Sequence, residues 1–285
     1  MNKRTSLSLA GIAAAALFAG QAFATVCPNA PATGTPTQSG PICIAPVGQD
    51  GAGTGLQDQL NGITVSGPGI DVYNDQYQPS SWWSIGATGN SENKIVLEIA
   101  GNASVNTFGI FDPTNASNHL QLFGGGASAG WSTQLANLGG GNYMVTNYNA
   151  AGVYQGQTSA TFGVTNLFGY YLDTPDGTFY SVPGMNPNSN ATYPGGVPHM
   201  VAYAGDGSTK LNIHGVAGKF LPNEFLLAWE DTLWANSDLD YNDFVVIVES
   251  VDPIPEPAAL GMFGFGVLLL GVIVGLRRRD AHNVV

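Results

Sequence analysis

Basic side chains are scarce in this sequence. The chain holds 8 Lys and Arg residues against 20 Asp and Glu residues, which gives a formal net charge of -12. Away from the two ends of the chain, the only basic residues are Lys94, Lys210 and Lys219. Such an acidic body disfavours binding to nucleic acid or to an anionic membrane, and it is compatible with divalent cations or with simple solubility. We therefore expect no nucleic-acid partner.

Residue patterns typical of catalytic centres are also few. His119, His199 and His214 are scattered without the spacing of a zinc site, and the sequence contains no GxxxxGK[ST] phosphate loop. One GxSxG pattern occurs at Gly126–Gly130, with Ser128 as its serine. A nucleophile elbow needs a strand before it and a helix after it, whereas this stretch is glycine-rich and has strand-like neighbours. We expect a surface loop and no enzyme; a secreted serine hydrolase is the least favoured alternative.

The N-terminus has the three parts of a secretory signal peptide. Lys3 and Arg4 form a short basic region, an apolar run covers Leu7–Phe18, and the small residues Ala22 and Ala24 follow in an A-x-A pattern. The apolar run is shorter than the roughly 20 residues that span a bilayer. The pattern predicts export, with cleavage after Ala24.

The C-terminus has the pattern of a single membrane-spanning helix. Residues 258–276 carry no charge and would form about 28 Å of helix, close to the thickness of the hydrocarbon core. Arg277, Arg278 and Arg279 follow directly. By the positive-inside rule these arginines stay in the cytoplasm, which places the body of the chain outside the inner membrane. A permanent anchor is one interpretation of this segment.

A second interpretation comes from the residues that flank this helix. The order Pro255, Glu256, Pro257, a glycine-containing apolar helix and a terminal arginine cluster resembles the PEP-CTERM sorting tail. The resemblance implies that a membrane-embedded exosortase is a partner and that the helix tethers the chain to the inner membrane only until processing. It also implies release to the cell surface or to an extracellular matrix of exopolysaccharide. Whether the tail is removed or kept stays open.

The remaining chain divides into an arm and a body. Residues 25–55 are rich in Pro, Gly and Thr and contain both cysteines, Cys27 and Cys43. In an oxidising compartment these two cysteines are expected to form one disulfide. Residues 56–252 form the predicted body, and residues 253–285 form the tail.

The body contains many short strand-like runs separated by turn residues. Because no long amphipathic helix interrupts them, and because we expect strands throughout the chain beyond Gly55, the sequence predicts an all-β antiparallel sandwich or jelly roll. The runs are Lys94–Ile99, Thr107–Phe111, Tyr143–Tyr148, Phe168–Leu172, Thr178–Val182, His199–Tyr203, Glu224–Trp229 and Phe244–Val248.

An acidic segment precedes the last of these runs. Glu230 and Asp231 end one strand-like run, and the sequence D-L-D-Y-N-D at Asp238–Asp243 comes before the next. Together with the upstream runs Phe168–Leu172 and Phe179–Ser181, this arrangement resembles the end of the DUF4114 family of exported bacterial proteins, over about residues 160–250. The resemblance implies a β domain and an exported context, and no activity.

The chemistry of this segment suits Ca²⁺, which takes about six to eight oxygen ligands. Asp238, Asp240 and Asn242 alternate as in an EF-hand, but Asp243 replaces the turn glycine and a strand follows, so we do not expect an EF-hand. Carboxylates that only cap turns are the alternative. The candidate ligands are Glu230, Asp231, Asp238, Asp240, Asn242 and Asp243.

Two adjacent tryptophans, Trp82 and Trp83, offer an aromatic surface. Exposed aromatic rings can stack on sugars, but neighbours on a strand point to opposite faces, so at most one of the pair would be presented. Packing in the core is the alternative for both. We expect a surface or matrix protein with a structural or adhesive role, and the alternative is a carbohydrate- or matrix-binding module.

Overall fold

The computed structural model describes residues 42, 44–45, 55–77, 81–87, 89–98, 104–187 and 196–254. The predicted signal peptide with Ala22 and Ala24, the cysteines Cys27 and Cys43, and the tail from Pro255 onward lie outside these residues. Within the described ranges, no helix combines the length and the apolar character that a bilayer span requires.

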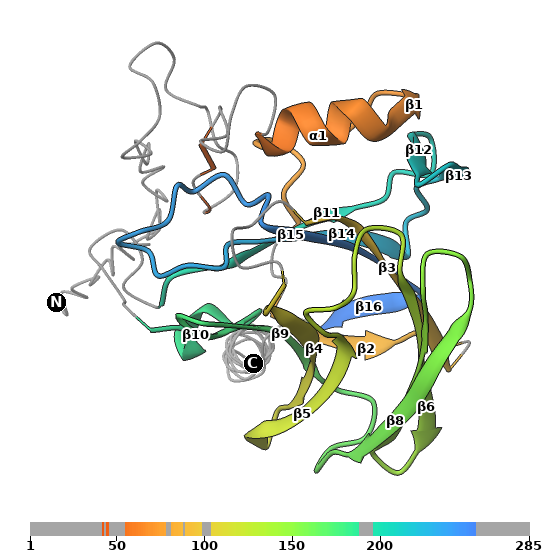
Figure 1. Cartoon of the computed structure of the whole chain (residues 1–285), viewed down its shortest axis with the longest axis vertical. Coiled ribbons are helices and arrows are strands. Elements are labelled where there is room, and N and C mark those ends of the chain that lie inside the picture. The colour runs from red at the N-terminus through yellow and green to blue at the C-terminus, as the bar shows by residue number, and fades with distance from the viewer. Residues whose placement is uncertain are drawn as a thin grey trace, which may run out of the picture.

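Two antiparallel sheets form the body of the protein (Figure 1). The larger sheet has seven strands in the spatial order β11 (Met200–Ala204), β14 (Glu224–Trp229), β15 (Phe244–Glu249), β3 (Asn90–Glu98), β6 (Ser132–Gly139), β7 (Asn142–Tyr148) and β8 (Tyr154–Thr161). The smaller sheet has four, in the order β10 (Gly177–Tyr180), β9 (Gly169–Thr174), β4 (Thr107–Asp112) and β5 (Asn115–Phe123). The predicted all-β antiparallel sandwich is confirmed, and each of the eight predicted runs overlaps a strand. Thr178–Val182 extends two residues beyond β10, and Ile99 lies outside the described residues.

Smaller elements pack around the two sheets. They are the helix α1 (Leu56–Ile63), a sheet of β1 (Thr64–Ser66), β12 (Lys210–Ile213) and β13 (Val216–Lys219), the pair β2 (Trp82–Ile85) and β16 (Val251–Ile254), and the 3-10 helix η1 (Pro183–Met185). The expectation of strands only beyond Gly55 was wrong at α1. Leu56 and Leu60 lie one turn apart on this helix and are both buried, but eight residues are too few for the helical period to stand out.

Aromatic side chains dominate the core between the two sheets. The ring of Phe108 on β4 lies 5.5 Å from Tyr170, 5.8 Å from Trp229 and 5.2 Å from Phe244, measured between ring centroids. Trp83 packs into the same core against Phe225, Tyr170 and neighbouring residues. These contacts join the four-stranded sheet to strands β14 and β15 of the seven-stranded sheet.

A second core covers the opposite face of the seven-stranded sheet. Leu226 and Val245 point into it, where Leu56 and Leu60 of α1 and Leu211 of β12 meet them. Strands β14 and β15 are therefore buried on both faces, and every residue of Glu224–Trp229 is buried. This is the reason that both strands are continuous apolar runs without alternation.

We expect Phe108→Ala to lower the free energy of unfolding by about 3–5 kcal/mol, because it leaves a cavity among four aromatic rings. Urea unfolding followed by fluorescence measures this loss. Leu138→Ala is the control: Leu138 is 60% exposed, and its truncation should change stability by no more than about 0.5 kcal/mol. Equal losses for the two variants would contradict the assignment of this core.

Candidate metal centre

The acidic segment connects two neighbouring strands at one end of the seven-stranded sheet. Trp229, the last residue of β14, lies directly opposite Phe244, the first residue of β15. The connection must therefore leave and re-enter the sheet at the same place. Its second and last residues meet there, since the backbone N–H of Asp231 donates to Oδ2 of Asp243 at 2.9 Å.

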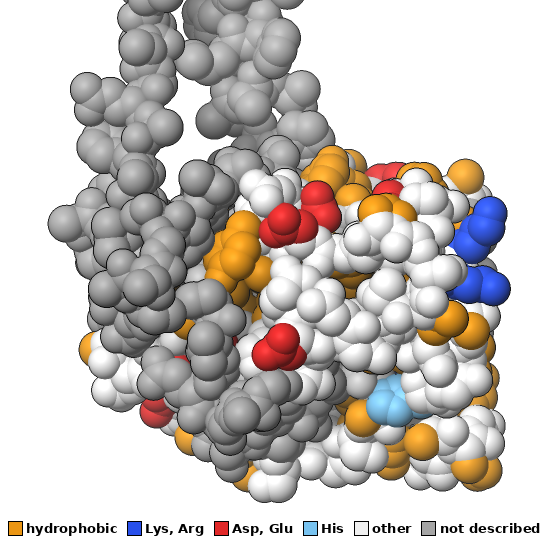
Figure 2. All heavy atoms as spheres, turned by 90° about the horizontal axis from the view of Figure 1, so that it is seen from above, with side chains coloured by type: hydrophobic (Ala, Val, Ile, Leu, Met, Phe, Trp, Pro, Cys, Tyr) orange, Lys and Arg blue, Asp and Glu red, His pale blue; other side chains and the backbone are white. Residues whose placement is uncertain are grey.

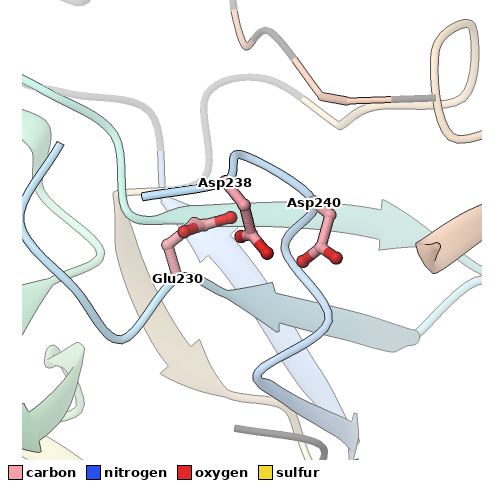
Figure 3. A group of neighbouring side chains, drawn as sticks. All are labelled: Glu230, Asp238 and Asp240. Atoms are coloured by element: carbon pink, nitrogen blue, oxygen red, sulfur yellow. The ribbon is translucent and has the colours of Figure 1, made fainter. Parts of the chain in front are cut away.

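Three carboxylates of this connection gather at one point. Glu230, Asp238 and Asp240 each offer an oxygen, and these oxygens lie within 4.8 Å of one another. Figure 3 shows Glu230 extending from the end of β14 toward Asp238 and Asp240, which come from the loop. Glu230 and Asp240 are buried, with exposed fractions of 1% and 0%, and Asp238 is half-buried. The group is therefore largely buried, and Asp238 is its most accessible member.

The loop reaches this geometry through two left-handed residues. Leu239 and Tyr241, which alternate with the aspartates, have φ angles of 62° and 54°. A left-handed conformation costs a non-glycine residue about 1–2 kcal/mol, so the surroundings must stabilise it. The buried Tyr241 hydroxyl donates to the carbonyl of Pro198 at 2.8 Å, and the carbonyl of Leu239 accepts from the N–H of Ala45 at 2.6 Å. These contacts with distant parts of the chain therefore stabilise the left-handed conformation of the loop.

Hydrogen bonds also orient the carboxylates. Oε1 of Glu230 accepts from the backbone N–H of Tyr241 at 2.8 Å, and Oε2 accepts from the hydroxyl of Ser237. Oδ2 of Asp240 accepts from the side-chain amide of Asn242 at 2.7 Å. A carboxylate oxygen has two lone pairs, so each of these oxygens keeps the capacity to bind a cation.

Burial and mutual repulsion disfavour the charged forms of these acids. Burial raises the pKa of Glu230, and the nearby charges of Asp238 and Asp240 raise it further. Burial likewise raises the pKa of Asp243, with additional contributions from Glu230 and Asp231. A cation bound among Glu230, Asp238 and Asp240 would oppose this rise at Glu230, because a nearby opposite charge favours the ionised form.

The other predicted ligands have different roles. Asp231 accepts from the side-chain amide of Asn106 at 2.8 Å, and Asp243 caps the N–H of Asp231. Asp240 also caps the backbone N–H of Asn242 at 3.3 Å. The structure therefore brings together three of the five predicted acidic ligands, and Asn242 contacts this group through its hydrogen bond to Asp240. Turn-capping occurs alongside them.

Two residues of this site were not found from the sequence. Ser237 lies inside the acidic segment, and its position directly before the D-L-D-Y-N-D run could have suggested it. Asn106, which lies 125 positions from Asp231, leaves no sequence signal because only the packing of the two sheets brings it there.

The other candidate residues are spread over the molecule. Trp83 is fully buried and offers no face for stacking, while Trp82 is half-buried with its ring 5.6 Å from Phe111. Ser128 is exposed in the loop between β5 and β6, which lacks the strand–turn–helix context of a nucleophile elbow. His199 is buried, and its ring centroid lies 3.8 Å from that of Phe179. Burial lowers the pKa of His199 to about 4.

The basic side chains of the described residues lie at the opposite end of β15. Lys94 and Lys219 line a cavity of about 170 Å³ together with Glu249, the last residue of that strand. Lys210 lies directly opposite Lys219. In the view of Figure 2, the visible basic side chains accordingly lie next to each other at one edge of the molecule. The two ends of the sheet thus differ in charge.

Two glutamates face each other at that end. Glu224 on β14 lies directly opposite Glu249 on β15, and like charges in this position are destabilising. Burial raises the pKa of Glu249 to about 7; the charges of Glu224 and Glu92 add to this rise, and Lys94 opposes it.

Comparison with known proteins adds no relative to this picture: no family model, no curated protein and no solved structure matches the chain.

The Glu224–Glu249 pair predicts a stability that falls as the pH rises. Folding raises the pKa of Glu249 from 4.5 to about 7. The protonated Glu249 therefore contributes stability that is fully present below about pH 4.5 and is lost as the pH rises through about 7. We expect Glu249→Gln to raise the urea midpoint at about pH 8 and to leave it nearly unchanged at about pH 4.

Asp58→Asn is the control for this experiment, because Asp58 is an exposed carboxylate on α1 and is not among the residues that line the cavity at Glu249. It should not reduce the dependence of the midpoint on pH. A Glu249→Gln protein with the same pH dependence as the unmodified chain would contradict the assignment to Glu249.

Proposed function

We propose that this protein is an exported component of the cell surface or extracellular matrix, with a structural or adhesive and non-catalytic role, whose sandwich is stabilised by Ca²⁺ bound to Glu230, Asp238 and Asp240. The observation that carries the calcium proposal is the gathering of these three carboxylates within 4.8 Å in a largely buried site. Two like charges about 4 Å apart repel by about 1–4 kcal/mol, depending on the local dielectric.

The chemistry of the donor set favours Ca²⁺ over zinc. All three candidate ligands are carboxylates, and the group contains neither His nor Cys. Ca²⁺ is bound by hard oxygen ligands from carboxylates, carbonyls and water, whereas structural zinc sites use mainly thiolate and imidazole. Extracellular modules bind Ca²⁺ with dissociation constants of about 10⁻⁴–10⁻³ M, so a site of modest affinity suits an exported protein.

A cation here would connect two parts of the chain. Glu230 follows the end of β14, while Asp238 and Asp240 belong to the loop that leads into β15. Binding would fasten this loop to the central strand pair and favour the strained turn at Leu239 and Tyr241. The effect of Ca²⁺ would therefore be an increase in stability.

We expect excess Ca²⁺ to raise the melting temperature of the protein relative to excess EDTA. A ligand at about a hundred times its dissociation constant stabilises the folded state by about 2.7 kcal/mol, which shifts the midpoint of a domain of this size by about 5 °C or more. Asp240→Asn should abolish the shift, because it removes one carboxylate of the group.

Asp231→Asn is the matched control. Asp231 is a buried aspartate directly beside Glu230, but it lies outside the three-carboxylate group, and an asparagine can still accept the hydrogen bond from Asn106. This variant should keep the calcium shift. The calcium proposal fails if Ca²⁺ and EDTA give the same melting temperature for the unmodified protein.

The proposed export depends on the two ends of the sequence. The basic, apolar and A-x-A segments at residues 1–24 support secretion, and the Pro255-Glu256-Pro257 motif with its apolar helix and Arg277–Arg279 supports sorting by an exosortase. The all-β body, which the described residues form, is compatible with a surface or matrix role.

We expect the protein isolated from its native cells to begin at Thr25 and to lack the apolar tail. Intact-mass and N-terminal analysis of the surface or released fraction measures both ends. Replacing Pro255, Glu256 and Pro257 with alanine should leave the chain in the membrane fraction. Release of this variant at the normal level would instead show that the motif is not a sorting signal.

A further inference from the structure

The seven-stranded and four-stranded sheets enclose a cleft at the edge opposite to β11. A cavity of about 290 Å³ lies between Gln121 on β5, Asn147 on β7 and Gln155 on β8. Strand β5 contacts both β7 and β8, and Figure 1 shows β5 and β8 near each other. The glycine-rich loop that carries the GxSxG pattern forms another wall through Gly126. The volume is at the small end of the range for ligand pockets.

The lining of this cleft contains no ionisable side chain among the described residues. This distinguishes it from the cavity at Glu249, which three glutamates and two lysines line. In a chain with a net charge of -12, an uncharged cleft offers no counter-charge to an ionic ligand. It therefore selects for a neutral ligand.

An aromatic side chain stands at one side of the cleft. Trp131 lines it and is half-buried, and it packs against the core between the two sheets. Core packing holds the indole in place while part of it remains accessible. A fixed aromatic surface with a wet rim is suited to the apolar C–H face of a sugar ring.

Three amide side chains complete the lining. Gln121, Asn147 and Gln155 each carry both donors and an acceptor, which is the combination that sugar hydroxyl groups require. Oδ1 of Asn147 is buried and has no hydrogen-bond partner among the described residues. The terminal torsion of an asparagine is broad, so a small rotation could present this acceptor to a hydroxyl group.

We propose that this cleft binds a sugar ring of a neutral polysaccharide, with Trp131 as the stacking surface and Gln121, Asn147 and Gln155 as hydrogen-bonding groups. Gln121, Gly126 and Gln155 are exposed, so the cleft is open and the polysaccharide chain can continue on either side. The site is separate from the calcium candidate and does not depend on it, since the two share no residue.

Gly126 allows a test that leaves the core intact. A Cβ added at Gly126 would meet no heavy atom within 4 Å, so Gly126→Trp brings a large side chain to the cleft from a position that has room for a Cβ. Gly62→Trp is the matched control, because Gly62 is exposed on α1 and also has no atom within 4 Å of an added Cβ.

Binding is measured by ligand-observed saturation-transfer NMR and calorimetry with the purified full-length protein. The probes are cellohexaose, chitohexaose and mannohexaose as neutral oligosaccharides, and hexagalacturonate as an acidic one, at millimolar concentration. We expect at least one neutral probe to bind the unmodified protein and Gly62→Trp, and none to bind Gly126→Trp. Asn147→Ala should weaken binding about tenfold and Trp131→Ala at least as much, with most of the affinity retained in Trp131→Phe.

Three results would overturn the proposal. These are no binding of any neutral probe, binding that Gly126→Trp leaves unchanged, and binding of hexagalacturonate as tight as that of the neutral probes.

Discussion

The antiparallel pairing of β14 with β15 is the contact on which the rest of the structure depends. Both strands are apolar along nearly their whole length, and both of their faces are covered. The four-stranded sheet packs on one face through Phe108 and Tyr170, and α1 packs on the other through Leu56 and Leu60. Without this pair, both cores would lose the strand residues against which their other members pack.

The same pairing also sets the positions of two groups of charged side chains. Its register sets Trp229 against Phe244 at one end and Glu224 against Glu249 at the other, about 17 Å apart along the strands. The first end carries the three-carboxylate group and suits a cation, while three glutamates and two lysines line a cavity at the second. The neutral cleft at β5, β7 and β8 lies at a sheet edge without either kind of charge, so the three surfaces suit different partners.

Strands whose side chains enter a core were predictable. The run Glu224–Trp229 is strand β14 with the same limits, because a short, continuous apolar run flanked by turn residues is typical of a strand buried on both faces. Strand β8 was not predicted, since its residues are mostly exposed Gln, Thr and Ser that follow no apolar alternation. Pairing with β7 makes it a strand, and such a pairing between polar segments is invisible in the local sequence.

The sequence by itself determined the all-β class, the acidic character of the body and the presence of an acidic segment before the last long strand. Only the tertiary structure decided which carboxylates converge. Spacing shows that Asp238 and Asp240 are near in the chain, but their convergence with Glu230 requires the left-handed turns at Leu239 and Tyr241. These turns are stable only because buried contacts from distant parts of the chain offset their strain, and such contacts form only when the whole domain folds.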